Sequence, residues 1–97
     1  MTKLQQTQEI LQNHKSDIEN QFHVKQIGIF GSVTRGEENE NSDIDILVEF
    51  SKPVGFFTFL KLEEYLKNKL KADIDLVSKK ALKPVIGKQI LQEVIFI

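Results

Sequence analysis

Two aspartates separated by a single residue open an apolar run near the middle of the chain. Asp43 and Asp45 lie in the segment S-D-I-D-I-L-V, residues 42–48. Because side chains alternate between the two faces of a strand, we expect both carboxylates on one face and the apolar side chains on the other. Neighbouring carboxylates repel each other unless a positive charge lies between them, and hard divalent cations take oxygen ligands. The pair is therefore a candidate metal site.

A second polar motif precedes this one, where an earlier apolar run ends at Gly31 and Ser32. Glycine adopts backbone conformations that other residues avoid and lets a ligand approach the backbone closely. Ser32 stands where a short helix is expected to begin, and the free N–H groups of a helix N-terminus attract anions. Arg35 adds a planar guanidinium suited to phosphate. Phosphate donors beside metal ligands suit a metal–nucleoside triphosphate.

A further pair of aspartates, Asp73 and Asp75, lies in A-D-I-D-L-V, residues 72–77. Strand alternation puts both carboxylates on one face, so it does not decide which of the two would join Asp43 and Asp45 at the site. Three carboxylates from two adjacent strands can hold two divalent cations about 3.5–4 Å apart. Phosphoryl chemistry depends mainly on positioning and charge neutralisation, so a Cys or His nucleophile is not required.

The spacing of apolar residues predicts the elements that position these side chains. The expected helices cover residues 2–21, 56–70 and 84–92, with a short one inside 31–36, and the expected strands cover 24–30, 43–49, 72–77 and 93–97. The last segment is expected as a fourth strand or as an exposed end that binds a partner. The fold class is therefore α/β (α+β), a small mixed sheet of about four strands flanked by helices.

Two segments have a more open interpretation. Phe56 and Phe57 begin the expected 56–70 helix and should widen its core-facing surface, with contact to a partner as the alternative. The loop over 36–41 is acidic, and its Glu38 and Glu40 are expected to be solvated.

Length and composition limit the possible classes. A chain of 97 residues allows one small domain, and 40% hydrophobic residues suffice for a core. The net charge of −1 gives no argument for nucleic-acid binding, and the absence of Cys excludes disulfides and thiolate zinc sites. No apolar run reaches the roughly 20 residues of a membrane span, and residues 1–14 lack a signal-peptide core. A cytoplasmic location is expected.

The motif G-S-x(2)-R-G-E, followed by S-D-I-D and an apolar run, resembles the signature of the nucleotidyltransferase superfamily that includes DNA polymerase beta. The short chain most resembles its minimal nucleotidyltransferase (MNT) branch, the MntA-like antitoxins that pair with HEPN proteins. The match is specific over residues 31–48 and looser from there to residue 97. In this family a third carboxylate directly precedes a Leu-Val pair, and Asp75 holds that position here.

The resemblance implies a reaction and a site. The reaction is transfer of AMP from ATP to a tyrosine hydroxyl of a HEPN toxin, a ribonuclease that the modification silences. Asp43, Asp45 and Asp75 would be the catalytic, metal-binding residues, with two Mg²⁺ ions. Gly31 and Ser32, together with Arg35, would bind the nucleotide phosphates. Since the chain leaves no residues for a separate acceptor domain, we expect the acceptor to be another protein, in a homo- or hetero-oligomer.

Two other interpretations stay open on sequence grounds. In one, the domain has lost turnover and serves as an inactive nucleotide- or partner-binding module. Alternatively, it is an ordinary α/β domain whose turn and acidic strands arise by chance, or a Ca²⁺ binder, although it lacks the dense oxygen-ligand loop of an EF-hand.

Overall fold

The computed structural model describes residues 1–37, 39 and 42–97. Its elements are α1 (Lys3–Asn13), α2 (Lys15–Phe22), β1 (Val24–Phe30), α3 (Ser32–Arg35), β2 (Ile44–Phe50), α4 (Phe56–Leu70), β3 (Ile74–Ser78), a 3₁₀ helix (Lys79–Ala81), α5 (Pro84–Glu93) and β4 (Ile95–Phe96). Glu38 and Glu40 lie outside the described residues, so their solvation stays a prediction. None of the described helices has the length and apolar character needed to cross a membrane.

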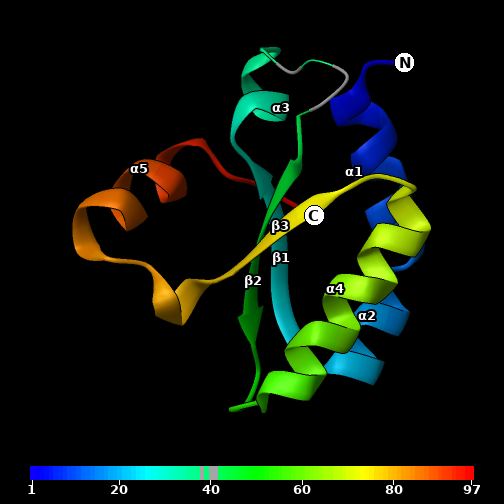
Figure 1. The fold of residues 1–97 in the computed structure, drawn as a ribbon, viewed down its shortest axis with the longest axis vertical. Coiled ribbons are helices and arrows are strands. Elements are labelled where there is room, and N and C mark those ends of the chain that lie inside the picture. The colour runs from blue at the N-terminus through cyan, green and yellow to red at the C-terminus, as the bar shows by residue number, and fades with distance from the viewer. Residues whose placement is uncertain (38, 40–41) are drawn as a thin grey trace.

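The sheet contains four strands in the order β3-β2-β1-β4. β1 runs antiparallel to both β2 and β4, whereas β2 and β3 are parallel. Parallel neighbours need a crossover connection, and α4 supplies it. In Figure 1, α1, α2 and α4 lie together on one side of the strands and α5 lies on the other. The expected mixed sheet flanked by helices is confirmed, and its fourth strand is shorter than the expected 93–97, because Glu93 ends α5 and β4 holds only two residues.

The core lies between the sheet and the layer formed by α1, α2 and α4. Its best-buried side chains are Leu11, Ile18, Ile27, Ile29, Ile44, Ile46, Val48, Leu62 and Leu66. Ile44 and Ile46 are 2% and 0% exposed and flank Asp45 in β2. Because side chains alternate along a strand, the carboxylate of Asp45 lies on the opposite face, away from this core.

The prediction of one helix over residues 2–21 is wrong at its middle, where α1 and α2 meet at His14. The backbone of His14 has φ −106° and ψ 7°, which interrupts the helical conformation. Its N–H still donates to the Ile10 carbonyl at 3.1 Å, and its carbonyl accepts from Ile18 N–H at 2.9 Å. The bend lets both α1 and α2 bury an apolar residue, Leu11 and Ile18 respectively.

The prediction that Phe56 and Phe57 enlarge the core is also wrong. They are 69% and 77% exposed, and their rings contact each other at 6.1 Å between centroids. Residues two positions apart on a helix do not share a face, so Phe57 points away from the stripe that contains Phe59. The buried part of α4 begins at Leu62.

Candidate functional site

The parallel pairing of β2 and β3 brings the two Asp-x-Asp segments together. Asp45 and Asp75 are direct partners in the register. Asp43 lies just before β2 and is exposed, so the expected strand over 43–49 starts one residue later than predicted. Asp73 lies at the level of Asp43, and its carbonyl accepts from Ile44 N–H at 3.1 Å. Of the two candidates, Asp73 lies just before β3 and Asp75 lies in it, and Asp75 is the one beside Asp45.

The electrostatics of Asp45 reflect this crowding. Burial raises the pKa of its carboxyl above the ordinary value, and the negative charges of Asp75 and then Asp43 raise the pKa further. The positive charge of Arg35 acts in the opposite direction. A group of like charges beside a partly buried carboxylate is a place where a cation would be stabilised.

The donor set at this position fits a hard cation, because Asp45 and Asp75 offer carboxylate oxygens from adjacent strands. Within the described ranges, no three acidic or histidine side chains are grouped closely enough to hold a metal by themselves. Mg²⁺ usually binds one or two carboxylates in proteins and completes its coordination with substrate phosphates and water.

The glycine turn packs directly against Asp45. Gly31 is buried and has φ +81°, a conformation that side-chain-bearing residues rarely adopt. A Cβ atom at this position would collide with the Asp45 carboxylate, beginning with its Oδ2 atom. The requirement for glycine thus comes from the close approach of the turn to a candidate metal ligand.

We predict that Gly31→Ala destabilises the fold by about 2 kcal/mol or more, since backbone strain alone costs about 1–3 kcal/mol and the collision adds to it. Gly36→Ala is the matched control, because Gly36 has φ +69° but open space around its missing Cβ. Urea denaturation of both variants measures the difference. Equal losses would mean that the approach to Asp45 contributes nothing.

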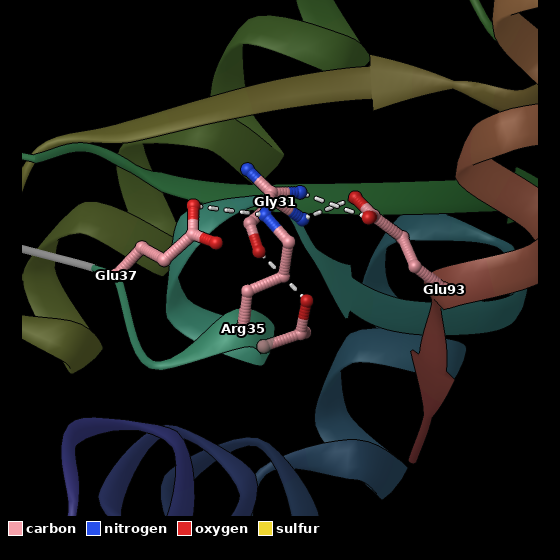
Figure 2. A network of polar contacts seen from close by, with 5 residues as sticks. Gly31, Arg35, Glu37 and Glu93 are labelled. Atoms are coloured by element: carbon pink, nitrogen blue, oxygen red, sulfur yellow. Dashed lines mark hydrogen bonds and ion pairs between the residues drawn. The ribbon is translucent and has the colours of Figure 1, made fainter.

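Arg35 is held by two carboxylates. Its NH1 donates to Glu93 Oε2 at 2.8 Å, and its Nε donates to Glu37 Oε2 at 3.3 Å. The Glu93 contact, followed by that of Glu37, raises the pKa of Arg35, so the guanidinium stays charged. Figure 2 shows Glu93 reaching the glycine turn and Arg35 together, with Glu37 on the far side of Arg35.

Glu93 is the site residue that sequence reasoning missed. Its Oε1 accepts from Gly31 N–H at 2.8 Å, while its Oε2 accepts from Arg35. It lies 62 residues after Gly31 in a segment whose apolar pattern indicates only a helix end and a strand. No local signal in the sequence connects it to the turn.

The structure thus gathers Gly31, Arg35, Asp45 and Asp75 around one end of β1 and β2. Ser32 begins α3 beside Gly31 and is half-buried. Asp43 lies at the edge of this group, near enough for its charge to act on Asp45. A paired carboxylate site beside a guanidinium and a tight glycine turn can hold a metal-bound polyphosphate. The individual roles of these residues stay predictions.

Sequence comparisons agree on one family. The model described as "Polymerase beta, Nucleotidyltransferase" matches residues 5–97. The protein adenylyltransferase MntA of Thermococcus cleftensis is 43% identical over 97 residues, which cover all of this chain and 98% of that relative.

Structural comparisons agree with the sequence. A solved structure described as a candidate minimal nucleotidyltransferase has a TM-score of 0.81 and 29% identity, covering 98% of this chain and 95% of that one. Another contains a tri-AMPylated HEPN toxin of Shewanella oneidensis in complex with an MNT antitoxin. Its TM-score is 0.66 at 22% identity, covering 92% of this chain and 70% of that one. At this lower identity the likeness shows the fold alone.

Proposed function

The chain belongs to the polymerase beta nucleotidyltransferase family, and we propose that it transfers AMP from ATP to a tyrosine hydroxyl of a HEPN toxin. The observation that carries this proposal is the pairing of Asp45 with Asp75 across β2 and β3, next to Gly31 and Arg35. A relative that covers the whole chain is a protein adenylyltransferase, which supports AMP as the transferred group.

In this proposal the acceptor hydroxyl oxygen attacks the α-phosphorus of ATP. A P–O bond forms to the acceptor, the bond between the α-phosphorus and its bridging oxygen breaks, and pyrophosphate leaves with the electron pair. Asp75 takes the proton of the hydroxyl. Ser32 and Arg35, on the turn that Gly31 shapes, hold the phosphates in line for the attack, since positioning and charge neutralisation supply most of the catalysis.

Asp43, Asp45 and Asp75 would hold Mg²⁺, with two ions expected. When bound, the metal supplies neutralisation of the charge that develops on the phosphates. The raised pKa of Asp45 supports this assignment, because repulsion from Asp75 and Asp43 contributes to it and a cation would remove that repulsion.

The proposed acceptor is a protein rather than a nucleic acid. The 43% identical relative named a protein adenylyltransferase and a 26% identical solved toxin–antitoxin structure with AMP-PNP support this choice. On this basis the chain acts as an antitoxin, and the modification silences the partner.

The deciding experiment incubates the protein with Mg²⁺, a HEPN-domain protein of the same organism and ATP labelled at either the α- or the γ-phosphate. We expect the α-label on the HEPN protein and no γ-label, because AMP transfer releases the γ-phosphate with pyrophosphate. Transfer should stop when EDTA removes the metal and when the acceptor tyrosine is replaced by Phe.

Other results identify other functions. Transfer of the γ-label would make the protein a kinase. Binding of ATP without transfer of either label would support an inactive binding module. Competition by GTP, CTP and UTP in the same assay defines the nucleotide preference.

A further inference from the structure

Glu93 joins two parts of the proposed nucleotide site, the glycine turn at Gly31 and the guanidinium of Arg35. One carboxylate oxygen accepts from the backbone N–H of Gly31 and the other from the guanidinium of Arg35, both at 2.8 Å (Figure 2). Glu93 is the last residue of α5, on the side of the sheet opposite α4 (Figure 1). A helix distant in sequence thus reaches the proposed phosphate-binding residues.

We propose that Glu93 is a positioning residue of the nucleotide site. Its carboxylate fixes the Gly31 turn and orients Arg35 toward the triphosphate. This inference rests on the proposed function, in which Arg35 binds phosphate.

The contact with Gly31 has a structural reason. Gly31 is buried, and a buried backbone N–H without an acceptor is costly, so such groups are almost always paired. Glu93 supplies the acceptor. The N–H of Gly31 is therefore used within the protein, and the contribution of Gly31 to the site is its shape and its close packing on Asp45.

The contact with Arg35 leaves the guanidinium able to bind a ligand. Arginine has more N–H donors than the contacts with Glu93 and Glu37 use. Arg35 ends α3, which begins directly after the glycine turn that packs on the Asp45 carboxylate. Holding this flexible side chain in place before ATP arrives removes part of the ordering cost of binding.

Glu93 itself comes from a well-anchored part of the chain. The next residue, Val94, donates its N–H to Ile90 at 2.9 Å, and β4 then pairs with β1 at Gly28 and Ile29. A Cβ atom on Gly28 would meet the side chain of Val94 at 2.6 Å. This close packing fixes the backbone position of Glu93 relative to β1 and the glycine turn.

The test measures the affinities for Mg·ATP and AMP by calorimetry in wild type, Glu93→Gln, Arg35→Gln and the double variant. Glutamine keeps an oxygen that can accept from Gly31 N–H, but its amide cannot hold the guanidinium as a carboxylate does. We expect Glu93→Gln to weaken ATP binding by about 2- to 12-fold, the ordering cost of one long side chain. AMP binding and the melting temperature should be unchanged.

The double variant shows whether Glu93 affects ATP binding by positioning Arg35 or independently of it. If Glu93 acts through Arg35, Glu93→Gln should cause no further loss of ATP affinity once Arg35 is replaced. Gln92→Ala, at the exposed neighbouring position of α5, is the matched control and should bind ATP as wild type does.

Three results would overturn the role of Glu93 while wild type still binds ATP. Tighter ATP binding by Glu93→Gln would show that the carboxylate competes with phosphate. Equal losses for ATP and AMP, or a loss that persists in the Arg35→Gln background, would show a general structural effect. An unchanged affinity would show no role in binding. Failure of the wild type itself to bind ATP would overturn the proposed function and this inference with it.

Discussion

Asp75→Asn should bind Mg·ATP with nearly wild-type affinity and transfer nucleotide at least about 100-fold more slowly, the usual minimum loss for a group that moves a proton in the transition state. The reason is the position of Asp75 beside Asp45 in the parallel register of β2 and β3. The phosphate-binding residues and the other carboxylates remain to hold the nucleotide, whereas the acceptor hydroxyl loses the group assigned to its proton. Single-turnover transfer of α-labelled ATP at saturating Mg·ATP measures the effect.

Asp73→Asn is the matched control, because it makes the same chemical change two residues earlier. Asp73 lies at the level of Asp43 rather than Asp45, and it precedes β3. Its variant should transfer at close to the wild-type rate. An inactive Asp73→Asn together with an active Asp75→Asn would reverse the assignment.

The variant with both Asp43→Asn and Asp45→Asn should lose the metal-dependent part of its ATP affinity, by at least about 100-fold. Residues that only support a metal ligand already contribute about 10- to 100-fold to metal affinity, so direct ligands should contribute more. Calorimetry with and without Mg²⁺ gives the affinity in each condition. A Mg·ATP affinity equal to that of wild type would remove these residues from the metal site.

The stability of Asp45→Asn serves as the fold control for this experiment. Because the pKa of Asp45 is raised in the folded state, the folded protein binds the proton more tightly than the unfolded chain does. Wild-type stability should therefore fall as the pH rises from about 4, the ordinary carboxyl value, through the raised pKa. Asp45→Asn should melt higher than wild type at pH 7, and the difference should shrink at pH 4 and below.

Much of the fold follows from local sequence patterns. The bounds predicted for β1 and α4 agree with the structure because apolar runs and stripes of sufficient length define these elements on their own. The bend at His14 does not follow, because it depends on how α1 and α2 fit against the sheet rather than on their periodicity. The exposure of Phe56 and Phe57 likewise depends on where the covering layer ends.

The site, too, has a part that can be predicted from the sequence and a part that cannot. The glycine turn and the aspartates are close in sequence to strand ends, so their grouping follows once β2 and β3 are neighbours. Glu93 joins them through β4, a strand of two residues whose pairing with β1 determines the position of the end of α5. Such long-range pairing leaves no periodic signal at Glu93 itself.

The distance in sequence between Gly31 and Glu93 has a consequence for biosynthesis. Ribosomes extend a chain at about 5–20 residues per second, so the 62 residues that separate the pair take about 3–12 s to make. During this interval the nascent chain carries the glycine turn without the acceptor for its buried N–H. During the same interval, one edge of the central strand β1 has no pairing partner, because β4 has not yet been made. The joined nucleotide site therefore forms only after α5 and β4 have been made, and a chain that stalls before Glu93 cannot form it.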